Sequence, residues 1–485
     1  MSLPRRFPSL VIRADSLAPQ GAFAEAQAEF LSPDPATIRD LEALLRSRNA
    51  GIVAHFYMDP ELQGVLSACE WPHIRISDSL LMADAAVGMV EAGARAIVVL
   101  GVDFMSENVR AMLDAAGHTD VPVYRVAAEP IGCSLAASAD APAYGAYLAK
   151  ASETPRSLHV IYINTSLDVK ARSHHLVPTI TCTSSNVVQT VLQAAAQIPD
   201  VHIWFGPDTY MGENLRALFA GMARMDDDAV RAVHPAHDAA SIASLLERFH
   251  YFRQGVCIVH HMFGAEVAAA VRRDYADAFV TAHLEVPGEM FELALAAQRD
   301  GRGVVGSTSN ILGFIGDKVG EAAAAGTGER LRFVLGTEAG MITSIVRRVQ
   351  TILRERGGRI EAEIIFPVAA EAVATTDDAE LAIVPGVAGG EGCSTAGGCA
   401  TCPYMKMNSL DALLDLLQRA GATGDDLTPF FPRTYSATIG GRTAADLGGE
   451  PILHMRHFSR TGALSDALVD DVTRRPGAAR STARP

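Results

Sequence analysis

Short apolar runs alternate with segments of helical apolar spacing along most of this chain. Residues 33–49 contain an Asp-Pro helix start and predict a helix, and residues 50–57 (AGIVAHFY) predict a buried strand. A capped helix over 76–93 and a strand over 94–101 continue this order. Buried strands that alternate with helices are typical of parallel sheets in layered α/β proteins.

The same order of elements returns twice farther along the chain. Strands are predicted over 158–164 and 201–206, and again over 278–285 and 331–336, with helical segments between them. The whole pattern predicts an α/β fold.

An internal repeat supports a division into similar units. Residues 99–113 (VLGVDFMSENVRAML) match residues 203–219 (IWFGPDTYMGENLRALF), and residues 333–346 form a fainter third copy. We therefore expect three similar three-layer α/β domains with parallel sheets in a pseudo-threefold arrangement. The expected division is an N-terminal arm over 1–33, α/β units over 34–132, 133–256 and 257–354, an insertion with a closing helix over 355–433, and a C-terminal extension over 434–485. We expect both terminal stretches to be tails or surface extensions.

Composition and charge narrow the class of protein. Of the 485 residues, 49% are hydrophobic and 20% are charged, which is typical of a globular protein. The net charge of −15 argues against nucleic acid and against anionic membrane surfaces as partners. No apolar run reaches the roughly 18 residues that span a bilayer. The first residues also lack the apolar core of a signal peptide, so we expect a cytoplasmic protein.

A cysteine in a Gly-rich stretch follows each copy of the repeat. The first two are Cys133 and Cys257, and the third is Cys402 in GGCATCPYMKMN, where spacing alone leaves Cys393 and Cys399 open as alternatives. Three thiolates from three similar units would meet on the pseudo-threefold axis. Such a set suits an iron–sulfur cluster with one iron left open for substrate.

Polar side chains mark the predicted strand ends and helix starts. Helices begin with hydroxyl-bearing residues at Asp78-Ser79, at 183–186 and at 307–310, where backbone N–H groups favour anions. Ligands of α/β proteins bind at the carboxyl ends of strands. Acid/base and amide side chains occur there or next to a proposed thiol: His55, Tyr57, Tyr162, Asn164, His260, His283 and Glu285.

Motifs spread over about residues 50–420 resemble those of the quinolinate synthase family. The matching strings include AHFYMDPELQ, SDSLLMA, YINTSLDVKA, CTSSN, GVCIVHHMF, VGSTSNIL and CPYMKMNSL, and the longer last unit is similar to the plant-type branch. The resemblance implies three α/β domains around a [4Fe-4S] cluster. It implies that iminoaspartate and dihydroxyacetone phosphate condense to quinolinate with loss of phosphate and two waters. An enzyme that supplies iminoaspartate would be a partner.

The resemblance also implies roles for individual residues. It assigns the cluster ligands to Cys133, Cys257 and Cys402. By the same matching, the substrate site would include His55, Tyr57, Ser79, Tyr162, Asn164, Ser184, His260, His283, Glu285, Ser307 and Thr308. Glu285 and Tyr57 are the candidates for moving protons, with His283 and His260 orienting oxygens. This chain departs from the family pattern at Leu284 and Val286, where HPEC is frequent, and at Phe252, where tryptophan is usual.

Three other functions share some of these features. An aconitase-like hydro-lyase also uses three cysteines and an open iron, with the iron acting as Lewis acid. A redox sensor could use the thiols of Cys399 and Cys402, but the chain has no basic helix-turn-helix segment. A scaffold with a structural zinc would use the same thiols.

Overall fold

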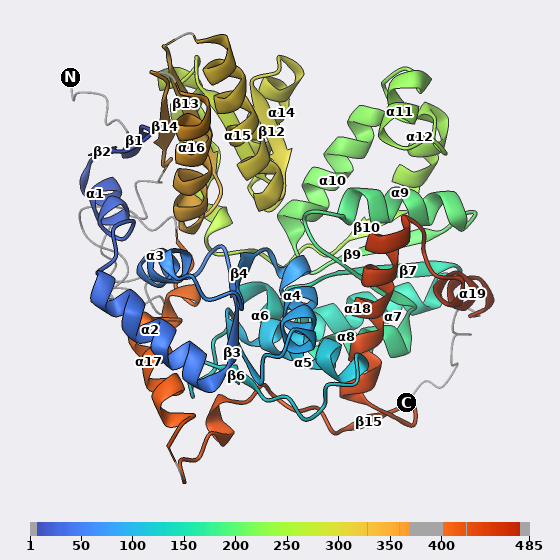
Figure 1. Cartoon of the computed structure of the whole chain (residues 1–485). Helices are drawn as coiled ribbons and strands as arrows, with labels where there is room; N and C mark the ends of the chain where they lie inside the picture. Colours follow the sequence, from blue (N-terminus) through green and yellow to red (C-terminus); the bar gives the residue numbers. More distant parts are fainter. Residues whose placement is uncertain (1–6, 327, 358, 368–400, 423, 476–485) are drawn as a thin grey trace, which may run out of the picture. The chain divides into compact units, whose positions relative to one another are not determined.

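The computed structural model describes residues 7–475 apart from 327, 358, 368–400 and 423, so Cys393 and Cys399 lie outside the described residues (Figure 1). Two compact units make up the chain. Unit 1 combines Met1–Val102, Thr119–Ile131 and Ile258–Phe431, and unit 2 combines Asp103–His118, Gly132–Cys257 and Pro432–Pro485. None of the helices in the described part is long and apolar enough to cross a membrane.

Unit 1 holds a four-stranded and a six-stranded sheet with their covering helices. Its elements are β1 (Ser9–Ile12), β2 (Leu17–Gln20), α1 (Ala22–Glu29), α2 (Pro35–Arg48), β3 (Ala50–His55), α3 (Pro60–Ala68), β4 (Ile74–Ser77), α4 (Ser79–Glu91), β5 (Ala96–Leu100), β6 (Val123–Arg125), η1 (His260–Met262), α13 (Ala265–Asp274), β11 (Phe279–His283), α14 (Gly288–Arg299), β12 (Gly303–Gly306), α15 (Thr308–Ala325), β13 (Arg330–Gly336), η2 (Ala339–Met341), α16 (Ile342–Arg356), β14 (Glu361–Ile365), η5 (Met405–Met407), α17 (Leu410–Arg419) and η6 (Thr428–Phe430).

The four-stranded sheet has the order β4-β3-β5-β6, and all of its strands are parallel. The six-stranded sheet has the order β12-β11-β13-β14-β1-β2, in which the first four strands are parallel and the last two antiparallel. Helices α15 and α16 pack against each other beside this sheet (Figure 1). Apolar positions of α16, such as Ile345, Val349 and Ile352, recur at helical spacing and join the core of the sheet.

Unit 2 holds one parallel sheet of order β10-β9-β7-β8. Its elements are α5 (Asp103–Ala115), α6 (Ser134–Asp140), α7 (Pro142–Glu153), β7 (Ser157–Tyr162), α8 (Leu167–Leu176), β8 (Thr179–Cys182), α9 (Val187–Gln197), β9 (His202–Gly206), α10 (Thr209–Met222), α11 (Asp227–Val233), α12 (Ala239–Glu247), β10 (Phe249–Tyr251), β15 (Thr438–Ile439), β16 (Arg442–Thr443), α18 (Ala444–Thr461) and α19 (Asp466–Arg474).

The α/β class with parallel sheets is confirmed. The predicted strands over 50–57, 94–101, 158–164, 201–206 and 278–285 correspond to β3, β5, β7, β9 and β11. The expected domain boundaries and the pseudo-threefold arrangement stay predictions.

The expectation that residues 1–33 form an arm or tail without regular structure is wrong. β1 pairs antiparallel with β14, and Ser9 Oγ donates a 2.7 Å hydrogen bond to Glu363. The strand SLVI is too short to show periodicity, and its partner lies about 350 residues away in the chain. β14 itself lies inside the sheet, although residues 355–392 were expected to be a peripheral insertion.

The C-terminal stretch was also expected to be a surface extension, yet it forms α18 and α19. Helix α18 packs closely on α8. The approach leaves room only for glycine at position 448, since a Cβ at Gly448 would stand 2.2 Å from the carbonyl oxygen of Leu167. Buried Ala444 and Leu447 face Ala171 of α8 in a small core. The Gly- and Arg-rich composition hid the helical spacing of these apolar positions.

Truncating Leu447 tests whether α18 stabilises unit 2. Leu447 is 7% exposed, whereas Leu453 of the same helix is 40% exposed. We expect Leu447→Ala to lower the free energy of unfolding by about 2–4 kcal/mol, because it removes buried methyl groups and leaves a cavity. Leu453→Ala should cost less than about 1 kcal/mol. Urea denaturation followed by circular dichroism measures both, and equal losses would contradict the packing of α18.

Candidate functional site

Polar side chains follow the carboxyl ends of five parallel strands in unit 1. β3 ends at His55 and β11 ends at His283. Asp78, Ser307 and Thr337 come directly after β4, β12 and β13. Because ligands of α/β proteins bind at this edge of a sheet, unit 1 carries a candidate site at its strand ends.

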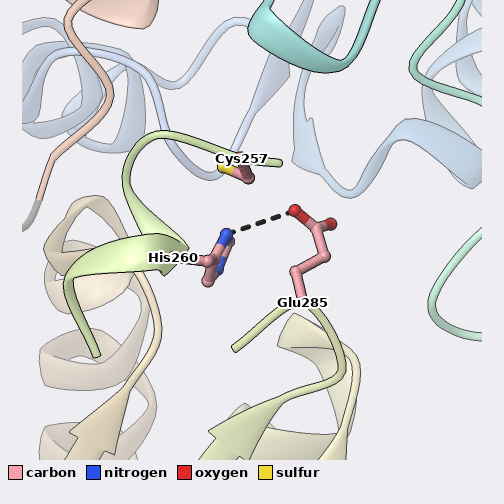
Figure 2. A group of neighbouring side chains, drawn as sticks. All are labelled: Cys257, His260 and Glu285. Carbon is pink, nitrogen blue, oxygen red and sulfur yellow. Dashed lines mark ion pairs between the residues drawn. The ribbon is translucent and has the colours of Figure 1, made fainter. Parts of the chain in front are cut away.

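An ion pair between His260 and Glu285 lies at the centre of this group (Figure 2). His260 Nδ1 is 3.2 Å from a Glu285 carboxylate oxygen, and the two residues are 0% and 4% exposed. The ring of His283 stacks on that of His260 with centroids 4.9 Å apart. Little water competes for these groups, so their electrostatic interactions are strong.

A hydroxyl connects this ion pair to Tyr57. Thr337 Oγ1 lies 2.8 Å from the Tyr57 hydroxyl and 3.4 Å from His260 Nε2. Thr337 is buried, and Tyr57 is half-buried. Tyr57, Thr337, His260 and Glu285 therefore form a continuous row of hydrogen-bonding groups along which a proton can be passed.

The other two histidines of the site are held neutral. Burial lowers the pKa of His55 to about 4 and the pKa of His283 to about 3, although Glu285 opposes both shifts. His55 Nδ1 accepts the backbone N–H of Tyr57, and His283 Nδ1 accepts that of Glu285. These contacts leave the ring proton of each on Nε2.

A second carboxyl group, that of Glu338, lies in the same region. Burial and the charge of Glu285 hold the pKa of Glu338 well above its ordinary value. The backbone N–H of Cys402 donates a 3.1 Å hydrogen bond to the Glu338 carboxyl. This contact brings the loop that carries the proposed third thiol to the carboxyl end of β13.

Two of the predicted helix starts lie beside these strand ends. Asp78 caps α4, Ser307 caps α15, and Ser309 Oγ donates a 3.0 Å hydrogen bond to Asp78. Ser79 and Thr308 are the first residues of their helices. The N-terminus of the 18-residue helix α15 offers unpaired N–H groups and a positive end of the helix dipole.

In unit 2 the predicted site residues also follow strand ends. Tyr162 is the last residue of β7, and Ser184 comes two residues after the end of β8. The third predicted helix start differs from the other two. Asn186 precedes α9 without a side-chain bond to the helix, and its Oδ1 accepts the backbone N–H of Thr183.

A buried lysine fixes the backbone on both sides of Asn164. Lys170 Nζ donates to the carbonyls of Ile163, at 3.1 Å, and Thr165. Burial lowers the pKa of Lys170, and the nearby carboxylate of Glu107 opposes this shift. The half-buried Asn164 side chain therefore projects from a backbone segment whose carbonyls are held by the Lys170 amine.

The three proposed cluster cysteines are all half-buried. Within unit 2, Ser134 Oγ donates a 3.0 Å hydrogen bond to the carbonyl of Val256, so the segments that carry Cys133 and Cys257 are adjacent. Cys257 is joined to unit 1 through the next peptide bond, and ligand atoms of Cys257, His260 and Glu285 lie within 4.8 Å of one another (Figure 2). Thiols that are neither buried nor fully exposed fit a cluster with one accessible metal.

The structure brings five of the predicted site residues of unit 1 to one region: His55, Tyr57, His260, His283 and Glu285. Ser79, Ser307 and Thr308 stand at the neighbouring helix starts, and Tyr162, Asn164 and Ser184 belong to unit 2. The roles of all these residues stay predictions.

Sequence reasoning missed Thr337 and left Glu338 undecided. Glu338 falls in the third copy of the internal repeat, where its position matches Asp103 and Asp208 of the first two copies, and the repeat alone did not separate a structural cap from a catalytic group. Asp208 caps α10, but Glu338 makes no cap bond and lies buried beside Glu285. Thr337 directly follows the predicted strand over 331–336 and Glu338 comes next, so the strand-end rule that found His55 pointed to this position.

Comparison with known proteins identifies the family. Residues 39–356 match the family model described as "Quinolinate synthetase A protein". The chain is 55% identical to a chloroplastic quinolinate synthase of Nicotiana tabacum over 98% of its length and 68% of the relative's. Chloroplastic quinolinate synthases of Arabidopsis thaliana and Oryza sativa are each 53% identical, over 96% of this chain and 67% and 69% of their own lengths.

One expectation from the sequence is corrected by these relatives. The chain was expected to be cytoplasmic, but the relatives are named as chloroplastic proteins. The absence of a signal-type apolar segment was the wrong test, since it addresses secretion alone.

The same relatives decide between the functions that the sequence left open. The hydro-lyase, the redox sensor and the zinc scaffold lack support, whereas the match to quinolinate synthases extends over nearly the whole chain. The chain therefore belongs to the quinolinate synthase family of enzymes.

Proposed function

We propose that this enzyme condenses iminoaspartate with dihydroxyacetone phosphate to give quinolinate, with loss of phosphate and two waters. Family membership supports the product, and the motifs of the chain support the substrates. The observation that carries the proposal is the buried row Tyr57, Thr337, His260 and Glu285, because a condensation with dehydration needs protons to be moved at a site protected from water.

The proposed cofactor is a [4Fe-4S] cluster held by Cys133, Cys257 and Cys402. When bound, it supplies an open iron that acts as a Lewis acid on a ligand oxygen. Support comes from the soft thiol donors, their partial exposure and the adjacency of the segments that carry Cys133 and Cys257.

The residues of unit 1 suggest a direction for proton movement. If His260 Nδ1–H donates to Glu285, His260 Nε2 accepts from Thr337, and Thr337 in turn accepts from Tyr57. The Tyr57 oxygen then takes a proton from substrate while its own proton moves toward Glu285. Neutral His55 and His283 can donate from Nε2 and orient substrate oxygens.

The anionic groups of the substrates require donors, since the chain carries a net charge of −15. Ser307 and Thr308, with the N–H groups that begin α15, suit the phosphate of the triose. Further proposed contacts to the phosphate and the dicarboxylate come from Ser79, Ser184, Tyr162 and Asn164. An enzyme that supplies iminoaspartate stays a proposed partner.

Replacing Glu285 tests the proton relay. We expect Glu285→Gln to lower turnover by about 100-fold or more, because the amide cannot accept the proton of His260 as a carboxylate does. Glu289→Gln, an exposed change four residues later, is the matched control and should keep normal turnover. Quinolinate formed from both substrates is measured by absorbance after separation. Near-normal turnover of Glu285→Gln with unchanged cluster content would remove Glu285 from the relay.

Serine replacements test the cluster ligands. Cys133→Ser, Cys257→Ser and Cys402→Ser should each lose most of the iron, sulfide and visible absorption of the anaerobically reconstituted protein, because serine is a poor iron ligand. Cys69→Ser is the matched control, since Cys69 is half-buried and the structure keeps it packed against the core of the four-stranded sheet. Equimolar zinc without sulfide in the native chain would contradict the cluster.

A further inference from the structure

A cavity of about 670 Å³ opens in unit 2 and is lined by none of the residues assigned to the site above. It is bounded by α7, by β9 and β10, and by the residues that follow β10. Its volume lies within the range of about 300–1,000 Å³ that is usual for small-molecule sites. The proposed reaction uses none of the residues that line this cavity.

The charge around this cavity is one-sided. Three exposed cations line it, Lys150, Arg216 and Arg253, and no acidic residue is among the lining residues. Within the part of the chain that the structure describes, none of the three forms an ion pair. Arg216 donates a 3.4 Å hydrogen bond to the carbonyl of Leu246, and the guanidinium of Arg253 lies over the ring of Tyr251. In a chain with a net charge of −15, such a group of uncompensated cations favours an anion.

Aromatic rings form the floor between these cations. The imidazole of His250 stacks on the indole of Trp204 with centroids 4.2 Å apart, and the ring of Tyr147 meets Trp204 edge-on at 5.3 Å. Burial, with His202, Lys150 and Arg216 acting in the same direction, lowers the pKa of His250 to about 4, so both cations lie within electrostatic reach of this ring. The floor is therefore neutral and aromatic at pH 7.

We propose that this cavity binds a planar aromatic anion, whose ring packs on the His250 and Tyr251 side and whose charged group pairs with Lys150, Arg216 and Arg253. Guanidinium groups bind phosphate and carboxylate through paired hydrogen bonds, and aromatic rings prefer stacked partners. A mononucleotide and a pyridine dicarboxylate share this chemistry. Each would bind at a place distinct from the strand ends of unit 1.

Trp204 provides a local reporter for the test. The chain has two tryptophans, so Trp71→Phe leaves Trp204 as the sole indole. The probes are adenosine 5′-monophosphate, quinolinate, adenosine and inorganic phosphate, each titrated into the anaerobically purified protein without substrates. We expect saturable quenching of Trp204 by at least one of the two aromatic anions, and weaker binding of adenosine and of phosphate. The anion that binds more tightly identifies the ligand class, either a mononucleotide or a pyridine dicarboxylate.

Charge variants locate the binding. Lys150→Gln and Arg216→Gln should each raise Kd by about fivefold, the effect of one partly exposed ionic contact. Arg224→Gln, an exposed arginine of unit 2 outside the cavity, is the matched control and should leave Kd unchanged. Calorimetry on the chain with both tryptophans repeats the comparison if Trp71→Phe does not fold.

Three results would overturn the proposal. The first is the absence of a saturable response to either aromatic anion. The second is a Kd that is the same in Lys150→Gln and Arg216→Gln as in the parent protein. The third is binding of inorganic phosphate that is as tight as binding of the nucleotide. Because the titration needs no turnover, its outcome does not depend on whether the proposed condensation is correct.

Discussion

The desolvation of ionisable groups at the strand ends of unit 1 is the constraint on which the site depends. Glu285, His260 and Glu338 are removed from water, and a buried charge is costly unless it is paired or neutralised. His260 pairs with Glu285, whereas Glu338 responds through a raised pKa and a backbone donor. The surroundings thus pair Glu285 with His260 and shift Glu338 toward its neutral form, and such perturbed groups are typical of catalytic sites.

The backbone does much of the positioning that these side chains need. Parallel strands of the two sheets of unit 1 end at His55 in one sheet and at His283 and just before Thr337 in the other, and local contacts then set the orientation of the two imidazole rings. The amide of the fully buried Gln63 donates to the carbonyls of Phe56 and Gly340, both at 2.8 Å. That contact joins the loop after β3 to the turn after β13, and so it keeps Tyr57 within reach of Thr337.

How much of the fold and the site the sequence could predict depended on how far apart in the chain the interacting residues lie. Strands such as β3 and β11 have local apolar patterns, and the side chains at their ends, including His55 and Glu285, were found from them. Thr337 also stands at a strand end but was passed over, because a lone threonine shows no acid/base chemistry until Tyr57 and His260 are placed beside it. β1 and α18 were missed because their stabilising partners, β14 and α8, are remote in the chain and no local pattern encodes such pairing.

The pairing of β1 with β14 has a consequence for biogenesis. β1 can pair with β2 as soon as both strands are made, but its other edge stays unpaired until β14, which ends at Ile365, has left the ribosome. By contrast, the strands of the parallel sheet in unit 2 all lie between Ser157 and Tyr251. Contacts of such long sequence separation form slowly, so the edge of β1 that faces β14 is open to association with other chains until β14 is made.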